Sequence, residues 1–297
     1  MQHKNLYAVS IIGAGKVGTT LAMLLHRAGY RIVSVVSKKK SSARKLARLV
    51  GCKNMSDSLS DIHPATRIIV IAVPEEDILG IAEEIATHPH LDFSKLAVVH
   101  TSGSLTSDAL LPLRREGALV FSLHPMQSFS KALTVIHQIA RMKNVCYGFE
   151  GNKAAVPLAR RLVKALRGTF VRIPKEEKFL YHIACVFASN YSAALLGVVD
   201  ELAKHIGGGI RLSHFEPLVR TSIENVFQLT PNMALTGPIA RGSSKTVEHH
   251  VLELRKIDTS LALLYQQIGL QALKMAVKKK SIRPKVAKQI RRILTSN

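Results

Sequence analysis

Hydrophobic and polar positions follow two different patterns along this chain. Up to about residue 174, short apolar runs typical of buried parallel strands alternate with stretches that carry apolar residues at helical spacing. We expect strands at 7–12, 31–37, 67–73, 95–100, 118–123, 145–149 and 169–173. We expect helices at 17–28, 41–50 and 152–168. This alternation predicts a mostly parallel, doubly wound sheet with helices on both faces.

The pattern changes after Pro174. From Glu176 to about Ile206, helix-forming residues recur with a period near 3.6, and three consecutive glycines then end the predicted helix. Further helices are expected at 215–228, 245–255, 260–277 and 285–294. The pattern therefore predicts an α/β domain over residues 1–174 and an all-α C-terminal domain over residues 175–297.

Three glycines mark the junction between the first strand and the first helix. Gly13, Gly15 and Gly18 form the pattern GxGxxG within the sequence AVSIIGAGKVG. The first glycine allows a tight turn, the second lets a pyrophosphate approach the backbone, and the third lets the helix pack closely on the strand. The surrounding strand, helix and second strand favour a Rossmann-like dinucleotide site over a merely tight turn. The residues expected to contact the cofactor there are Gly13, Ala14, Gly15, Lys16, Val17 and Gly18.

The end of the second strand bears on the choice of dinucleotide. An NAD site usually places a carboxylate there to bind the ribose 2′-hydroxyl. This chain has the sequence VSKKKSSAR instead, without a carboxylate. We expect Ser37, Lys38 and Arg44 to bind a 2′-phosphate, which makes NADP the predicted cofactor. Lys39 and Lys40 are candidates for plain solvated surface.

Composition and charge add few constraints to this picture. The chain has 297 residues, of which 47% are hydrophobic, and a formal net charge of +22. This charge favours a small anionic substrate. No acidic residue follows Asp258, but the basic C-terminal stretch lacks the interleaved aromatic residues that stack nucleobases. We expect a solvated helix face there rather than a nucleic-acid or membrane contact, and no run of about 18 apolar residues suggests a membrane-spanning helix.

The cysteines indicate a compartment and exclude one class of site. Cys52, Cys146 and Cys185 are scattered and never spaced as CxxC. A disulfide framework or a metal site is therefore not expected, and a reducing cytoplasm fits best.

Three further stretches carry a resemblance to a known group of proteins: HTSGSL at 100–105, SLHPMQSF at 122–129 and TGPIARG at 236–242. With the glycine turn, they resemble a bacterial family that joins a Rossmann-like domain to a C-terminal domain of unknown function. That family is similar to the 3-hydroxyacid and 6-phosphogluconate dehydrogenases, ketopantoate reductase and prephenate dehydrogenase. The resemblance implies a helical C-terminal domain for substrate binding and dimerisation, and a homodimer. It covers nearly the whole chain.

The predicted strand ends place several of these stretches on one rim of the sheet. Ligands of open parallel sheets bind beyond the carboxyl ends of the strands. Ala72, Val73 and Pro74 close the third strand, where related folds lay the chain against the cofactor. Ser102 and His124 close the next two strands and are candidate catalytic residues. The alternatives are a helix cap for Ser102 and a buried structural histidine for His124.

The long predicted helix departs from the related enzymes. Several of them carry a catalytic lysine four residues before an asparagine; Asn190 matches the asparagine, but Val186 stands in place of the lysine. We expect no lysine near the cleft and consider His182 as a general acid or base on the same helix face as Ser189. A helix-packing histidine is the alternative.

Arg241, in the TGPIARG stretch, is a candidate to bind a substrate carboxylate or phosphate. Its alternative is an exposed arginine in a turn that opens the helix from Lys245. The aspartate that commonly follows ARG in the family is replaced here by Gly242 and Ser243.

These observations predict an NADP-dependent oxidoreductase that moves hydride to or from a carbonyl, imine or hydroxyacid of a small anionic substrate. The alternative is a non-catalytic NADP(H)-binding sensor or partner protein, favoured by the missing lysine.

Overall fold

The computed structural model describes residues 8–296 and divides the chain into two compact units, Met1–Tyr191 and Ser192–Asn297. Tyr7, predicted to start the first strand, lies outside the described residues. The first unit extends past Pro174, where the sequence pattern changes, and includes the beginning of the long predicted helix.

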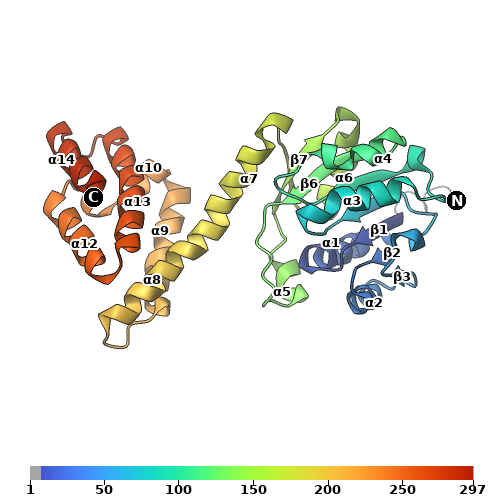
Figure 1. The fold of residues 1–297 in the computed structure, drawn as a ribbon, viewed down its shortest axis with the longest axis horizontal. Coiled ribbons are helices and arrows are strands. Elements are labelled where there is room, and N and C mark those ends of the chain that lie inside the picture. The colour runs from blue at the N-terminus through green and yellow to red at the C-terminus, as the bar shows by residue number, and fades with distance from the viewer. Residues whose placement is uncertain (1–7, 297) are drawn as a thin grey trace. The chain divides into compact units, whose positions relative to one another are not determined.

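An eight-stranded sheet forms the centre of the first unit, in the order β3-β2-β1-β4-β5-β6-β7-β8 (Figure 1). Its pairs are parallel except β6 with β7, which is antiparallel. The strands are β1 (Ala8–Ile12), β2 (Arg31–Val36), β3 (Met55–Ser56), β4 (Ile68–Ile71), β5 (Ala97–His100), β6 (Leu119–Pro125), β7 (Cys146–Gly151) and β8 (Thr169–Arg172). The predicted strands are confirmed; β3 was missed because two residues carry no periodicity.

Helices cover both faces of this sheet. They are α1 (Lys16–Arg27), α2 (Lys40–Leu49), α3 (Glu75–Ala86), α4 (Leu111–Arg115), α5 (Val135–Ala140), α6 (Val156–Ala165) and α7 (Lys178–Val186). Short 3-10 helices lie at Leu59–Asp61, Phe93–Lys95, Ser107–Leu110, Lys153–Ala155 and Lys175–Glu177. Two separate apolar clusters pack between sheet and helices, one with α1, α2 and α6 and the other with α3 and α4. The doubly wound α/β prediction is confirmed.

The second unit is entirely helical among its described residues, as predicted. Its helices are α8 (Ser192–Ile206), a 3-10 helix (Leu212–Phe215), α9 (Glu216–Gln228), α10 (Pro231–Ala234), α11 (Gly237–Ala240), α12 (Ser244–Ile257), α13 (Thr259–Lys278) and α14 (Pro284–Thr295). Ile290 and Leu294 of α14 are buried in a core with Val247 and Leu273. The basic residues of α14 therefore form its solvent face, and its apolar face is used within the unit.

The long predicted helix is interrupted. A π-helical turn, Phe187–Tyr191, separates α7 from α8. The turn changes the 3.6-residue period between His182 and Ser189, and Ser189 is exposed whereas His182 is half-buried. The expected spacing of two regular α-helical turns between His182 and Ser189 is therefore not kept.

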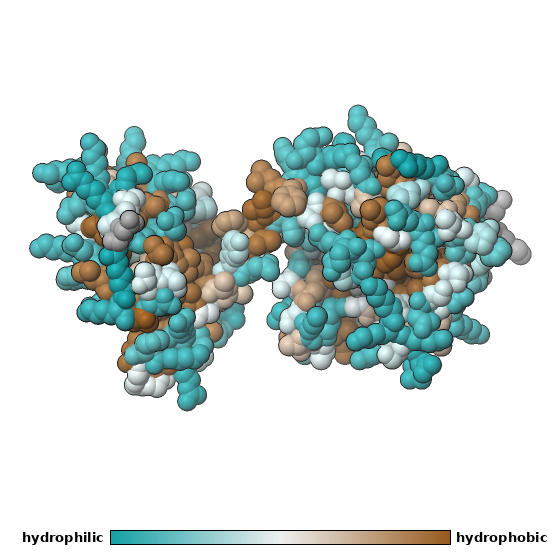
Figure 2. Space-filling view, viewed as in Figure 1, coloured by the Kyte–Doolittle hydropathy of each residue, from teal (hydrophilic) through white to brown (hydrophobic). Residues whose placement is uncertain are grey.

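The outer face of α7 is apolar and exposed. Phe179 and Leu180 each retain 67% of their accessible surface. Figure 2 shows apolar side chains gathered over α7. By length and composition alone, the segment Lys175–Ile206 is also apolar enough to cross a membrane. The sequence analysis missed this property because polar residues interrupt the apolar ones.

Candidate functional site

The glycine turn between β1 and α1 has the geometry of a pyrophosphate cradle. Gly13 has φ +97°, and a Cβ added there would lie 2.3 Å from the Ala72 carbonyl oxygen. A Cβ on Gly18 would lie 1.9 Å from the Gly13 carbonyl oxygen. A Cβ on Gly15 would instead meet nothing within 4 Å. The first and third glycines therefore allow close backbone packing, and the second leaves open space at the start of α1.

Two grooves meet at this turn, with volumes of about 560 and 330 Å³. Both are lined by Ala14, Gly15, Ala72, Val73 and Pro74. The larger groove continues past the side chains of Lys16, Val17, Thr19, Ser42, Lys45, Thr101, Phe129 and Lys131. The smaller continues past Ser37, Lys38, Asp57 and Asp77. An extended dinucleotide fits this arrangement, because the open backbone of Gly15 lies where the grooves join.

The charges at the end of β2 are partly paired. Lys38 Nζ lies 2.8 Å from Asp77 Oδ1, and Lys40 Nζ lies 3.8 Å from Asp57 Oδ1. Arg44 is exposed and lines neither groove. Of the three residues predicted to bind a 2′-phosphate, Ser37 and Lys38 thus face the smaller groove and Arg44 does not.

A cluster of aromatic and imidazole rings lies at the carboxyl end of β6. Tyr181 Oη hydrogen-bonds His124 Nδ1 at 2.7 Å, and the rings of His124 and His182 are 6.2 Å apart at 82°. Two glycines make room for these rings. A Cβ on Gly103 would lie 2.6 Å from His182 and 3.1 Å from His124, and one on Gly148 would lie 2.5 Å from Tyr181 Oη. The structure therefore brings His124 and His182, two candidate residues from distant parts of the sequence, together.

A buried lysine anchors the same cluster. Lys178, in the first turn of α7, is only 1% exposed, and its Nζ donates a hydrogen bond of 2.8 Å to Ser122 Oγ. Burial lowers the pKa of Lys178 to about 8, although the carboxylates of Glu150 and Glu75 act in the opposite direction. The expectation that no lysine lies near the candidate site was therefore wrong: Lys178 stands on the helix two turns before Val186.

Burial also changes the histidine chemistry that the sequence suggested. It lowers the pKa of His124 to about 4, and the positive charge of Lys178 adds to the effect. Burial raises the pKa of Tyr181 above its usual range. At pH 7 His124 is therefore a neutral hydrogen-bonding group rather than a charged acid, which corrects the role expected from an unperturbed histidine.

Ser102 hydrogen-bonds the carboxylate of Glu75, a residue that was not predicted from the sequence. Ser102 Oγ donates 2.8 Å to Glu75 Oε1, and Ser104 Oγ donates to Glu75 Oε2. Desolvation favours the neutral form of Glu75, but the hydrogen bonds from these hydroxyls outweigh it and hold the pKa of Glu75 below its usual value. Glu75 directly follows Pro74 of the cofactor grooves. An ionised carboxylate therefore lies beside the rim.

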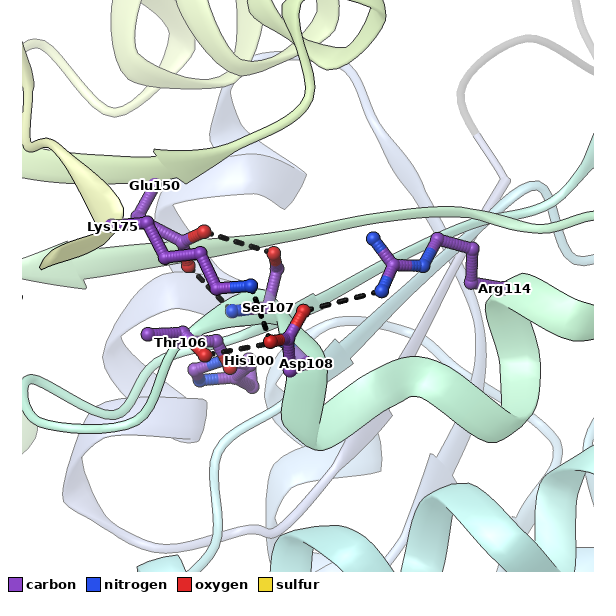
Figure 3. A network of polar contacts seen from close by, with 7 residues as sticks. All are labelled: His100, Thr106, Ser107, Asp108, Arg114, Glu150 and Lys175. Carbon is purple, nitrogen blue, oxygen red and sulfur yellow. Dashed lines mark hydrogen bonds and ion pairs between the residues drawn. The ribbon is translucent and has the colours of Figure 1, made fainter.

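An ion-pair network joins the segment before α7 to the first domain (Figure 3). Lys175 Nζ lies 2.5 Å from Asp108 Oδ2, and Arg114 Nη2 lies 3.2 Å from Asp108 Oδ1. The Arg114 pair is half-exposed and contributes little to stability by itself. The network instead orients the start of α7, because Lys175 lies one helical turn before Lys178.

Buried hydrogen bonds of Glu150 and His100 lie next to this network. Glu150 is 3% exposed and accepts hydrogen bonds from Ser107 N at 2.5 Å and Ser107 Oγ at 3.0 Å. His100 accepts from Ser102 N and hydrogen-bonds the Thr106 carbonyl through Nε2, as Figure 3 shows for the latter. Burial lowers the pKa of His100 to about 4. His100 is thus a satisfied structural histidine under the rim.

Two further predicted residues belong to other elements. Asn190 is exposed on the π-helical turn, within the first unit. Arg241 is the exposed C-terminal cap of α11 in the second unit, where the TGPIARG stretch forms a short helix rather than an open loop. Among residues 8–296 no group of three or more His, Cys, Asp or Glu side chains could hold a metal ion.

Three important side chains were missed from the sequence: Glu75, Lys178 and Tyr181. The signal for Glu75 was its place directly after the strand end AVP. Lys178 and Tyr181 are three residues apart in a predicted helix, which puts them on one face. Nothing in the sequence showed which face packs on the sheet.

Family models match both parts of the chain. A Rossmann-like domain matches residues 1–125, and the domain of unknown function DUF2520 matches residues 145–272. The chain belongs to the family that joins a Rossmann-like domain to a DUF2520 domain. The predicted resemblance is confirmed. The search of curated proteins gives no match.

Solved structures share the fold of this DUF2520 family member. Protein TM1727 from Thermotoga maritima is 24% identical, with a TM-score of 0.72, and covers 92% of this chain and 99% of its own. BF3122 from Bacteroides fragilis, provisionally named an NADP oxidoreductase, is 24% identical with a TM-score of 0.73 over 91% and 98% of the two chains. An imine reductase from Myxococcus stipitatus in complex with NADP⁺ is 17% identical, with a TM-score of 0.64 over 93% and 100%.

The glycine geometry gives a test that separates binding from folding. Gly15→Val should abolish NADP(H) binding while leaving the melting temperature nearly unchanged, because its side chain enters open space. Gly18→Val should unfold the domain, because its Cβ meets the Gly13 carbonyl. Calorimetric titration and thermal melts measure both. A Gly15→Val protein that binds NADPH like the wild type would contradict the cradle.

The buried histidines predict a loss of stability in mild acid. Because the folded pKa values of His100 and His124 are near 4, the unfolded chain takes up protons first as the pH falls below 6.5. At pH 5 each histidine should cost roughly 2 kcal/mol of unfolding free energy relative to pH 7.5. Urea melts of the wild type and His100→Gln should show a shallower pH dependence in the variant. Equal slopes would contradict a neutral buried His100.

Proposed function

We propose that this protein is an NADP(H)-dependent oxidoreductase that transfers hydride to or from a carbonyl or imine carbon of a small substrate. The observation that supports this proposal most is the position of the Gly15 cradle and its grooves beside the rim that carries His124, Tyr181 and His182. Related folds in complex with NADP⁺ and NAD⁺ support a dinucleotide. The bound cofactor would supply the hydride chemistry itself.

The chain's own residues would bind and orient the reactants. The amide groups at the start of α1 would hold the pyrophosphate, and Ala72–Pro74 would lie along the cofactor. Tyr181, whose high pKa keeps it protonated, would donate its hydroxyl to Nδ1 of neutral His124. The imidazole proton then resides on Nε2, which lies on the side of the ring that faces Gly103. There it can orient the heteroatom of the group being reduced.

The proposal also includes the charge of the substrate, the role of Arg241 and the cellular location of the protein. The formal charge of +22 supports a substrate that carries an anionic group. Arg241 is the second-unit residue suited to binding such a group. The free cysteines Cys52, Cys146 and Cys185 support a reducing cytoplasm.

NADP rather than NAD is supported by the end of β2. Ser37 and Lys38 line the smaller groove, and Ser42 and Lys45 line the larger one. The nearby carboxylates of Asp57 and Asp77 are paired with lysines. A 2′-phosphate would displace the weak, exposed pairing of Lys38 at little cost.

The cofactor preference can be measured directly. NADPH should bind at least about tenfold tighter than NADH, a difference of about 1.4 kcal/mol. Lys38→Ala should lose most of that preference by weakening NADPH alone, whereas the neighbouring Lys39→Ala should not. Equal NADPH and NADH affinities of the wild type in calorimetric titration would remove the assignment.

A role in turnover distinguishes an enzyme from an NADP(H)-binding sensor. With a substrate found in a screen of carbonyls, imines and hydroxyacids, His124→Ala should lower kcat by about 10²-fold, as loss of one preorganised hydrogen-bond donor does. NADPH affinity should stay unchanged, and His137→Ala on α5 serves as a control. If no compound is turned over although NADPH binds tightly, the sensor alternative holds.

We also propose that the protein is a homodimer. The exposed face of α7 with Phe179, Leu180 and Ile183 is too apolar for a solvated helix, and a second copy would cover it.

Light scattering tests the homodimer. The wild type should have twice the chain mass of 32.6 kDa at micromolar concentration. Leu180→Glu should shift it toward one chain mass, because a buried charge disrupts an apolar interface. Leu79→Glu, at an exposed leucine of α3, should not. A wild-type mass of one chain would refute the proposal.

A further inference from the structure

The first turn of α3 carries a carboxylate with an unusual set of partners. Both oxygens of Glu75 accept hydrogen bonds from serine hydroxyls of the loop after β5, Ser102 and Ser104, and neither makes an ion pair among the described residues. The serine loop itself is buried, whereas Glu75 is exposed on its other side. The loop thus fixes a carboxylate at the rim and leaves further lone pairs accessible, since each oxygen has two.

The helix does not need this particular charge. Glu76 and Asp77 lie in the same first turn and already place negative charge at the N-terminus of α3. Asp77 also pairs with Lys38 on the cofactor side. Stabilisation of α3 therefore accounts poorly for a carboxylate held in one orientation by two side chains.

The groups around Glu75 do not neutralise it, so Glu75 presents an accessible negative charge at the rim. His182 lies close enough to interact with it. His124 is neutral near pH 7, and the positive Nζ of Lys178 is buried against Ser122. His124 carries no net charge near pH 7, so the Glu75 carboxylate, held by Ser102 and Ser104, is the group on this surface that would attract a positively charged reacting group.

We propose that Glu75 binds the positively charged nitrogen of the substrate, so that the oxidoreductase reduces a protonated imine to an amine or oxidises that amine. This inference rests on the proposed function. An anionic group elsewhere on the same molecule is compatible with it. The substrate class is then a small imine–amine pair rather than a ketone–alcohol pair.

The proton balance of the reaction agrees with this choice. In the reducing direction hydride forms a C–H bond at the iminium carbon, the C=N π pair becomes the nitrogen lone pair, and the nicotinamide is oxidised. The iminium carries its proton from the start, so no acid is required at that moment. Reduction of a ketone would leave an alkoxide that needs a proton, and neutral His124, the side chain proposed to orient the reacting group, is too weak an acid to supply one.

Binding measurements test the inference without requiring turnover. Pyrrolidine, piperidine and isopropylamine, all cationic at pH 7.5, are titrated calorimetrically into the protein saturated with NADP⁺. Their neutral counterparts cyclopentanol, cyclohexanol and isopropanol are titrated in parallel. At least one amine should bind more tightly than its alcohol. Glu75→Gln should weaken that amine at least tenfold and leave the alcohols unchanged, because only the charge is removed.

Matched variants exclude indirect effects. Glu76→Gln removes the same charge from the adjacent residue and should bind amines like the wild type, and Glu75→Asp should retain part of the affinity. Unchanged NADP⁺ affinity and melting temperature show that the variants are folded. The inference is overturned if no amine exceeds its alcohol, or if Glu75→Gln and Glu76→Gln behave alike, while NADP⁺ binding leaves the proposed function intact. Failure of the wild type to bind NADP⁺ overturns both.

Discussion

The burial of Lys178 at the carboxyl end of β6 is the contact on which the candidate site depends. A buried ammonium is costly unless it is hydrogen-bonded, and the Ser122 hydroxyl together with the charges of Glu150 and Glu75 offsets that cost. Lys178 thereby fixes the first turn of α7 against the sheet. Tyr181 and His182, one turn further on, then meet His124. The Lys175–Asp108 pair and the Glu150–Ser107 contacts hold the approach to this turn.

The same contact determines the protonation of the site. The charge of Lys178 adds to burial in keeping His124 neutral, and the serine loop keeps Glu75 ionised. His124 and Glu75, whose ordinary pKa values would make them an acid–base pair, therefore have different roles. His124 becomes a hydrogen-bonding group and Glu75 a fixed negative charge. This division agrees with the proposed function, in which the cofactor would supply the hydride and the side chains would select and orient the substrate.

The glycine turn and the exposed face of α7 satisfy opposite requirements. Gly13 and Gly18 allow backbone contacts that any side chain would prevent, and Gly15 leaves a space for phosphate. The α7 face instead presents large side chains without a covering element in its own unit. The first would suit a small anion and the second an apolar protein surface, so the proposed cofactor binding and the proposed dimerisation would use separate parts of the first unit.

The sequence by itself determined the order of strands and helices, the glycine turn and the approximate rim. Those features depend on local periodicity and on conformations that only glycine adopts, which neighbouring residues reveal. It missed α3 as an element, the π-helical turn and the pairing of β6 with β7. Only the tertiary structure decided that Lys178 meets Ser122 across 56 residues and that Glu75 meets Ser102 across 27. Such contacts follow from strand order and helix docking, and the resulting burial shifts the pKa values that determine what each side chain can do.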